Sequence, residues 1–326
     1  MFAGIGANLT SPIRLRRPSG IFITLVKTGA SVVELGLPDR HGNIQNVVLR
    51  LPNEAAYRAN PAYVGCTVGR VANRLSGAVL TVDDECHALA ANEGTTTLHG
   101  GPDHFGLRTW DVVHQSDDSA TLKLTSLDKD QGFPGLVQST VTYTLADDRV
   151  DICYEAVTDA PTYVNITNHA YFNLAAAGTV LHQYLQIFAS RYTPVDQNLL
   201  PTGEILPVAG TPFDMRSAME IQEGVTRRGR GFDENFVLDG PGGVAAVIFD
   251  PVSGRRLTIS TDQPGLQLYT GQHLRPEISG HVAYQGLCLE PQMFPNAPNE
   301  GAFTASPLRP GETYRHRSSW AWSVVK

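Results

Sequence analysis

Glu290 is the residue of this sequence that is best placed to act as an acid or a base. It follows the apolar run YQGLCL at residues 284–289 and precedes Pro291, Pro295 and Pro298. Proline fixes φ and removes a backbone donor, so these residues restrict the conformations of the segment that follows the carboxylate. We expect burial at the end of an apolar strand to raise the basicity of Glu290, and the stiff loop to hold the carboxylate in place.

Four other segments combine His, Arg, Asn or Asp with glycine or aromatic residues on an apolar background. Sugar hydroxyls require both donors and acceptors, which these polar side chains supply, and the apolar face of a sugar ring packs on an aromatic ring. The segments therefore indicate a carbohydrate site. They are GRVANRLSGA (69–78), TTLHGGPDHFGLRTW (96–110), VNITNHAYFNLAAAG (164–178) and GRGFDENFVLDG (229–240), and their candidate aromatic platforms are Phe105, Trp110, Tyr171 and Phe236.

Each of these side chains also has a purely structural interpretation when it is considered alone. A histidine such as His99 or His169 is often a structural residue bonded to the backbone. Glu290 could be the buried partner of an arginine, and Asn73 could be a turn residue. The single residues leave both interpretations open, and it is their combination that favours a binding site.

Alternating apolar and polar residues recur along the chain and predict the elements that must position these groups. Turn-forming sequences such as PDRHGN, ADDR and PVSG separate the alternating segments, and helical patterning is confined to NEAAYRAN at residues 53–60. Many short strands at hairpin spacing predict an all-β fold, a large and mostly antiparallel β-sandwich. Since we find no internal repeat and no shift in composition, we expect residues 1–326 to form a single domain. The predicted strands are 22–27, 121–126, 139–145, 150–157, 245–250, 256–261 and 266–271.

The composition limits the partners of the protein. Its 326 residues are 42% apolar and 17% charged, which is typical of a globular protein with a sizeable core. The formal net charge of −7 argues against nucleic acid or an anionic membrane as a partner, and the basic runs at residues 14–17 and 227–230 are assigned to solvated loops.

The cysteines and the N-terminal segment bear on the cellular location. Cys66, Cys86, Cys153 and Cys288 are scattered, so neither a disulfide framework nor a structural metal site is indicated. The segment MFAGIGANL lacks the basic start and continuous apolar stretch of a secretory signal, and no apolar run approaches the length of a membrane span. We therefore expect a cytoplasmic protein.

Together these segments resemble the aldose 1-epimerase, or galactose mutarotase, family. The resemblance extends from about residue 20 to residue 322 and implies the family's supersandwich, a large sandwich of mostly antiparallel strands. It also implies an isomerase that interconverts the α and β anomers of free aldoses such as galactose or glucose without a cofactor or a metal. Such an enzyme would feed hexose or pentose catabolism, as a monomer or a homodimer. The matching motifs, in the family's order, are GASVVELGLPDRHGNIQNVVL, GRVANR, LHGG, NHAYFNL, GFDENFVL, LQLYTG, CLEPQMFPNAPN and the spaced Y, H, S, W and W near the end.

The resemblance assigns roles to particular residues. Opening the sugar ring requires a base for the C1 hydroxyl proton and an acid for the ring oxygen, each typically worth roughly 10² to 10⁴ fold in rate. By resemblance, Glu290 is the base and His169 is the acid. To donate, His169 must carry a proton, so a neighbouring anion or the sugar should favour its charged form. The implied contacts to the sugar are Asn73, Arg74, His99, Asp233 and Gln267.

Two positions depart from the family's pattern. Glu234 stands where relatives commonly have a histidine, and Asn296 stands where an aspartate is common. Neither position is the acid or the base. The departures therefore bear on hydroxyl recognition and on sugar preference.

Other functions are compatible with parts of the sequence. A glycosidase that pairs Glu290 with Asp233 would leave both histidines without a role. A sugar-phosphate 1-epimerase would need further Arg or Lys at the site, and a lectin-like protein would be expected to lack Glu290 or His169. A metal enzyme could use His99, His169 and Glu290, and treatment with a chelator would then abolish its activity.

Overall fold

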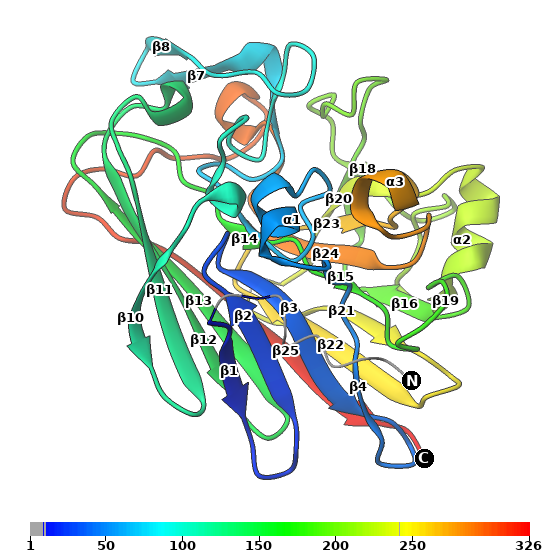
Figure 1. The fold of residues 1–326 in the computed structure, drawn as a ribbon. Helices are drawn as coiled ribbons and strands as arrows, with labels where there is room; N and C mark the ends of the chain where they lie inside the picture. The colour runs from blue at the N-terminus through cyan, green and yellow to red at the C-terminus, as the bar shows by residue number, and fades with distance from the viewer. Residues whose placement is uncertain (1–8, 10, 241) are drawn as a thin grey trace.

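The protein is built mainly from antiparallel sheets, as seen in a computed structural model (Figure 1). The structure describes residues 9, 11–240 and 242–326. Apart from Leu9, the N-terminal segment MFAGIGANL lies outside the described residues. Of the helices that are described, none has the length and apolar character needed to cross a bilayer.

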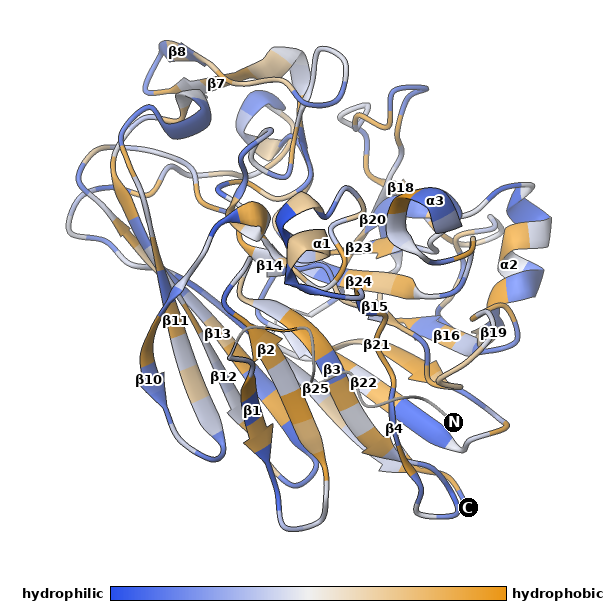
Figure 2. Ribbon diagram, in the orientation of Figure 1, coloured by the Kyte–Doolittle hydropathy of each residue, from blue (hydrophilic) through white to orange (hydrophobic). Residues whose placement is uncertain are grey.

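The largest sheet has nine strands, and most of the strands predicted from alternation belong to it. Buried and exposed residues alternate along β12 and β13, which is the period of a sheet with one face on the core. Figure 2 shows the same alternation of hydropathy along these strands. In sheet order the strands are β10 (Asp111–Gln115), β11 (Ser119–Ser126), β12 (Val137–Leu145), β13 (Arg149–Thr158), β25 (Tyr314–Val324), β22 (Arg255–Thr261), β21 (Val244–Phe249), β16 (Tyr184–Ile187) and β19 (Met219–Glu220).

Two smaller sheets complete the main framework. The apolar faces of all three sheets contribute to one cluster of buried side chains, which includes Ile23, Leu268, Leu289 and Trp320. The predicted all-β sandwich is therefore confirmed. The six-stranded sheet has the order β15 (Tyr171–Phe172), β24 (Leu287–Gln292), β23 (Gly265–Tyr269), β20 (Asp233–Val237), β17 (Arg191–Thr193) and β18 (Leu206–Pro207), and the four-stranded sheet contains β1 (Ile13–Arg16), β2 (Phe22–Val26), β3 (Ser31–Pro38) and β4 (Ile44–Asn46).

Short strand pairs, helical segments and loops surround one face of the six-stranded sheet. Figure 1 shows α1, α3 and the β7–β8 hairpin on this side of the molecule, above the large sheet. The strand pairs are β5 (Thr67–Val68) with β14 (Thr167–Asn168), β6 (Arg74–Leu75) with β9 (Thr97–Leu98), and β7 (Val79–Val82) with β8 (Glu85–Ala88). The helices are α1 (Glu54–Ala59), α2 (Ile221–Arg228) and α3 (Pro276–Ser279), and the 3₁₀ turns are η1 (Ser76–Ala78), η2 (Phe105–Leu107), η3 (Asp130–Gly132) and η4 (Ala297–Asn299).

Two predictions about these peripheral elements are wrong. Helix α1 was predicted, but α2 and α3 were not. The basic runs assigned to solvated loops lie partly in regular structure, because Arg14 is in β1 and Arg228 is in the last turn of α2. The side chain of Arg228 is only 8% exposed and forms an ion pair with the buried Glu234.

Candidate active site

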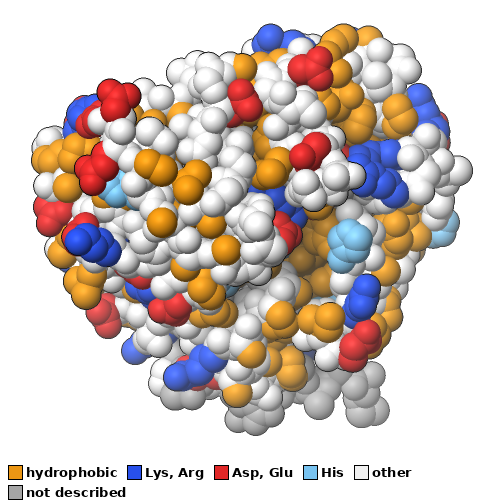
Figure 3. Space-filling view, turned by 90° about the horizontal axis from the view of Figure 1, so that it is seen from above, with side chains coloured by type: hydrophobic (Ala, Val, Ile, Leu, Met, Phe, Trp, Pro, Cys, Tyr) orange, Lys and Arg blue, Asp and Glu red, His pale blue; other side chains and the backbone are white. Residues whose placement is uncertain are grey.

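A single cleft brings together all seven residues that the sequence analysis selected. Its volume is about 380 Å³, within the usual range for a small-molecule site. Figure 3, viewed from above, shows a hollow bordered by acidic, basic and histidine side chains. The lining residues are Pro61, Ala62, Tyr63, Asn73, Arg74, Glu93, Leu98, His99, His169, Tyr171, Leu199, Asp233, Gln267, Tyr269, His273, Leu274, Ile278 and Glu290.

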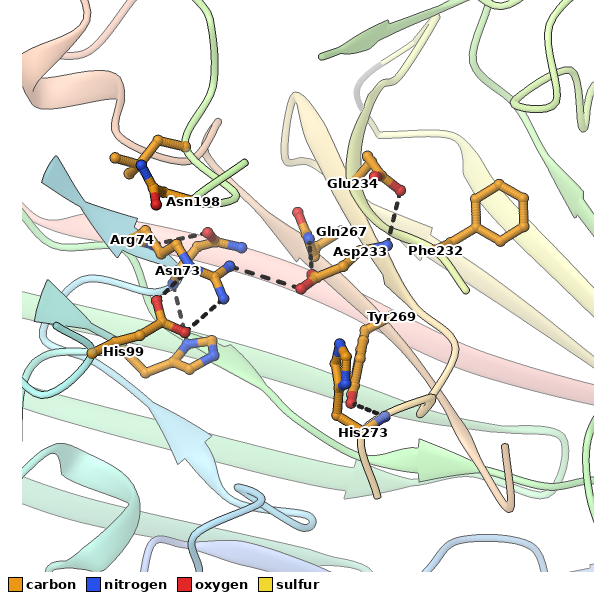
Figure 4. A network of polar contacts seen from close by, with 12 residues as sticks. Asn73, Arg74, His99, Asn198, Phe232, Asp233, Glu234, Gln267, Tyr269 and His273 are labelled. Atoms are coloured by element: carbon orange, nitrogen blue, oxygen red, sulfur yellow. Dashed lines mark hydrogen bonds and ion pairs between the residues drawn. The ribbon is translucent and has the colours of Figure 1, made fainter. Parts of the chain in front are cut away.

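The register of the six-stranded sheet places three of these side chains beside one another. Gln267 of β23 pairs with Glu290 of β24, and Tyr269 of β23 pairs with Asp233 of β20. Directly paired residues share a face, as do residues two apart in one strand. Asp233, Gln267 and Glu290 therefore project from the same face of the sheet, and Figure 4 shows Gln267 next to Asp233.

The same register explains why His169 meets Glu290. Tyr171 of β15 pairs with Cys288 of β24, and extending this antiparallel register by two residues sets His169 opposite Glu290. His169 Nε2 lies 3.8 Å from Glu290 Oε1, and both side chains are almost completely buried. An imidazole and a carboxyl group thus face each other at the floor of the cleft.

His99 and Asn73 are held by a reciprocal pair of hydrogen bonds. The backbone N–H of Asn73 donates to His99 Nδ1 at 3.1 Å, and the backbone N–H of His99 donates to the Asn73 carbonyl at 3.0 Å. Both residues have positive φ, 63° for Asn73 and 53° for His99. Non-glycine residues seldom adopt this conformation, and it is often kept where it positions functional side chains.

The hydrogen bond to Nδ1 also defines what His99 can do in the cleft. Burial lowers the pKa of His99 well below its ordinary value, so the ring is neutral near pH 7. Because Nδ1 accepts a hydrogen bond, the hydrogen of the neutral ring is on Nε2, which can then donate to a sugar oxygen.

This tautomer does not suit a metal centre. The ligand atoms of His99, His169 and Glu290 lie within 4.8 Å of one another, a spacing that a metal ion could bridge. A metal ligand must present a lone pair, and Nδ1 of His99 is already used by the N–H of Asn73 while Nε2 carries the hydrogen. Binding a metal through His99 would break the bond that orients its ring.

Arg74 and Asp233 form the polar wall beside the catalytic pair. Arg74 Nη1 lies 3.8 Å from Asp233 Oδ2, and Gln267 Nε2 donates to Asp233 Oδ1 at 2.7 Å (Figure 4). Burial raises the pKa of Asp233, and the positive charge of Arg74 opposes the rise. The group of donors and acceptors is suited to the vicinal hydroxyls of a sugar.

The electrostatics of the catalytic pair agree with the prediction for the base but not for the acid. Burial raises the pKa of Glu290 well above its ordinary value, as does the nearby Asp233 carboxylate. Burial lowers the pKa of His169 to about 4, so this histidine is not held in its charged form near pH 7. The desolvation of the ring outweighs a backbone hydrogen bond that favours its charged form.

The prediction for aromatic platforms is mostly wrong. Of the candidates, only Tyr171 lines the cleft, whereas Phe105, Trp110 and Phe236 belong to the apolar core. Phe236 adjoins Asn235 in β20, so strand alternation turns it to the opposite face from Asp233. The aromatic rings of the cleft are instead Tyr63, Tyr171 and Tyr269.

Four lining residues with functional side chains were missed from the sequence. Tyr269 lies two residues from Gln267 in the motif LQLYTG, so strand alternation could have identified it. Tyr63, Glu93 and His273 belong to segments between strands, where no periodicity indicates the direction of a side chain.

The two departures from the family's pattern lie outside the cleft lining. Glu234 is on the opposite face of β20 from Asp233 and contacts Arg228. Asn296 accepts a hydrogen bond from the backbone N–H of Ser76 at 2.9 Å, and so joins the loop after Glu290 to the segment that contains Arg74. Both side chains thus lie outside the cleft and contact segments that carry cleft residues.

An all-β sandwich with a buried carboxyl group and imidazole at the floor of a polar cleft defines an acid/base enzyme that acts on carbohydrate. Comparison with known proteins agrees. Residues 11–320 match the family model for aldose 1-epimerase. The chain is 36% identical to the aldose 1-epimerase of Escherichia coli over 93% of its length and 92% of the relative's, and 36% identical to human galactose mutarotase over 93% and 91%.

Solved structures show the same relationship. An aldose epimerase homologue from C. elegans is 31% identical, with a TM-score of 0.91 over 97% of this chain and 99% of that chain. Galactose 1-epimerase from Lactobacillus acidophilus is 28% identical, with a TM-score of 0.84 over 96% and 94%. The chain belongs to the aldose 1-epimerase family, and it is an isomerase of that type.

Proposed function

We propose that this protein interconverts the α and β anomers of free aldoses, with galactose and glucose as the first candidates, and that Glu290 and His169 carry out the chemistry. The observation that carries the proposal is the 3.8 Å separation of His169 Nε2 and Glu290 Oε1 at the floor of a cleft lined by sugar-binding side chains. Supporting groups are Asn73, Arg74, His99, Asp233 and Gln267.

In each half of the reaction, one member of the pair takes a proton from the sugar and the other gives a proton to it. The Glu290 carboxylate takes the proton of the C1 hydroxyl while His169 gives a proton to the ring oxygen, and the bond between C1 and the ring oxygen breaks to leave an aldehyde. After rotation about the bond between C1 and C2, the hydroxyl attacks the other face of the carbonyl. His169 then recovers its proton and Glu290 returns its own to the carbonyl oxygen, so the pair ends as it began.

The remaining substrate groups would be held by the walls of the cleft. Arg74 and the Nε2 hydrogen of His99 can donate to sugar oxygens, and Asp233 can accept from hydroxyls. Tyr171 and Tyr269 offer apolar ring surface to the C–H face of the sugar.

We further infer a single domain and retain the cytoplasmic location as a prediction. The largest apolar cluster includes residues from Ile13 to Trp320, so the ends of the described chain share one core. Whether the protein acts as a monomer or a homodimer, and whether it feeds hexose or pentose catabolism, also remain predictions.

The proposal is tested by polarimetry on freshly dissolved α-anomers of galactose, glucose, xylose and arabinose. Wild type should accelerate the approach to equilibrium, and Glu290→Gln and His169→Asn should each lower kcat by roughly 10² to 10⁴ fold. Suitable controls are Glu277→Gln on α3 and His182→Asn, because Glu277 is exposed and the His182 side chain is 83% exposed. If wild type binds these sugars but accelerates none of them, the catalytic proposal is wrong.

A further inference from the structure

Glu93 is a carboxylate of the cleft that the proposed chemistry does not use. It lies between β8 and β9, in a turn closed by hydrogen bonds between the backbones of Glu93 and Thr96. Its side chain is 42% exposed, whereas that of its partner Arg74 is 8% exposed. Glu93 is thus a partly exposed carboxylate on the rim, bonded to an arginine that is buried in the wall.

The contact between Glu93 and Arg74 uses two nitrogens on one edge of the guanidinium group. Glu93 Oε2 accepts from Arg74 Nε at 2.6 Å, and Glu93 Oε1 accepts from Nη2 at 2.9 Å. Two parallel charge-assisted bonds of this kind fix both the position and the plane of the arginine. The third nitrogen, Nη1, faces Asp233 at 3.8 Å.

One cation therefore lies between two carboxylates. Along the cleft lining that the structure describes, Arg74 is the one arginine or lysine. Burial lowers the pKa of both His99 and His169, so these rings do not add positive charge near pH 7. A ligand with a carboxylate or phosphate group would meet the negative charges of Glu93 and Asp233, and the edge of Arg74 formed by Nε and Nη2 is already occupied by Glu93.

A neutral sugar does not meet this obstacle. Its hydroxyls can accept from Arg74 Nη1 and donate to the oxygens of Asp233. The charges of Glu93, Arg74 and Asp233 thus distinguish ligands by their charge rather than by their shape.

We propose that Glu93 is a specificity-determining residue, which occupies the binding edge of Arg74 and so restricts the cleft to uncharged aldoses. This inference rests on the proposed function, since it concerns the same cleft. Glu93 acts through Arg74 and is a positioning residue, not a catalytic one. Without the carboxylate of Glu93, Arg74 becomes available to anionic sugars such as uronates and sugar phosphates.

The test compares neutral and anionic ligands in matched variants. Glu93→Gln keeps the size of the side chain but removes its charge, and Glu277→Gln makes the same change of charge on exposed α3, next to the cleft residue Ile278. The KM and kcat for galactose are measured by polarimetry, and galacturonate and galactose 6-phosphate are tested as competitive inhibitors. Binding of galactose and galacturonate is also measured by calorimetry.

For Glu93→Gln we expect a KM for galactose that rises more than kcat changes, and a Ki for both anions that falls about tenfold. Glu93→Asp, which retains the charge, should recover part of the selectivity of wild type. Glu277→Gln should change neither the KM for galactose nor the Ki for the two anions. These opposite shifts for neutral and anionic sugars are not produced by a residue that only supports the fold.

Two results would overturn the inference. One is an unchanged ratio of galactose to anion affinity in a Glu93→Gln protein whose melting temperature matches that of wild type. The other is an equal loss of affinity for all ligands that Glu93→Asp does not recover. Because calorimetry reads the selectivity without turnover, a protein that binds galactose but fails to isomerise it would refute the proposed function while leaving the role of Glu93 decidable.

Discussion

At the scale of residues, Glu290 and His169 behave as a pair that holds one proton. Burial raises the pKa of Glu290 and lowers that of His169 to about 4, so a proton shared by the two groups favours the carboxyl group. A protonated carboxyl group with a neutral imidazole holds as many protons as a carboxylate with an imidazolium, which is the form that begins ring opening. The bound sugar has only to redistribute the proton and need not recruit a second one from solvent.

The pH dependence of activity follows from this proton count. At low pH, activity is lost when a second proton binds to the pair and charges His169. Since the pKa of His169 is lowered to about 4, the loss should be centred near pH 4. A histidine at its ordinary pKa of 6.5 would produce the loss more than two units higher. The measurement is kcat/KM by polarimetry from about pH 3.5 to 8, with circular dichroism at each pH to confirm the fold.

A fall in activity centred near pH 6.5 would contradict this interpretation. If the fall occurs as the pH decreases, it would mean that His169 takes up this proton at its ordinary pKa and that burial does not disfavour the charged ring.

At the scale of elements, strand alternation determined most of what could be predicted about the fold. The predicted strands at 139–145 and 150–157 correspond to β12 and β13 because one face of each packs on the core and the other faces solvent. The same parity unites Asp233, Gln267 and Glu290 once their strands are in register. Periodicity did not predict that β20, β23 and β24 pair with one another. The resemblance to the family is what grouped Asp233, Gln267 and Glu290 as site residues.

Helix α2 shows why some elements could not be predicted. Its sequence IQEGVTRR includes glycine and β-branched residues, which are weak helix formers. The buried Ile221 and Gly224 secure it against the core, and a Cβ at position 224 would lie 3.0 Å from Met219 and 3.2 Å from Phe232. The helix is therefore stabilised by tertiary contacts that its local sequence does not reveal.

The ion pair between α2 and β20 leads to a prediction about stability. Arg228 is the partner of Glu234, whose carboxylate also accepts from the backbone N–H of Asp233 at 2.8 Å (Figure 4). Arg228→Met would leave the buried Glu234 with only the exposed Arg230, 3.6 Å away, as a charged partner, and should lower the free energy of unfolding by about 3 kcal/mol near pH 8. Denaturant unfolding followed by circular dichroism measures the change.

The loss of stability should depend on pH in a defined direction. Burial raises the pKa of Glu234 to about 7, and Arg228 opposes this rise, so the pKa rises further in the variant. A carboxyl group with a raised pKa favours folding in its protonated form, so the deficit should shrink as the pH falls from 8 to 5.5. Arg227→Met, one residue away with a side chain 45% exposed, is the control and should change stability little at either pH. Equal deficits for both variants would show that the helix, not the ion pair, is responsible.

At the scale of the whole molecule, the two faces of the six-stranded sheet have different roles: one packs in the core and the other lines the cleft. Leu268 and Leu289 on one face belong to the same apolar cluster as Leu257 and Ile259 of the nine-stranded sheet. The other face carries Asp233, Gln267 and Glu290 into the cleft. The large core thus holds polar groups at the floor of the cleft rigidly enough for acid/base chemistry.

The charge of the whole molecule should have little influence on the rate with a neutral sugar. The protein has a formal net charge of −7, and in its cleft Arg74 lies between the carboxylates of Glu93 and Asp233. A neutral aldose feels no long-range force from this field, so we expect kcat/KM for galactose to change by less than about twofold between roughly 0.02 and 0.5 M sodium chloride. An anionic sugar would instead be repelled, and its apparent affinity should improve as salt screens the carboxylates. Polarimetry with galactose across this range, beside inhibition by galacturonate, measures both effects. A strong decline of galactose turnover with salt would mean that attraction between charges contributes to binding, which a neutral substrate in this cleft does not allow.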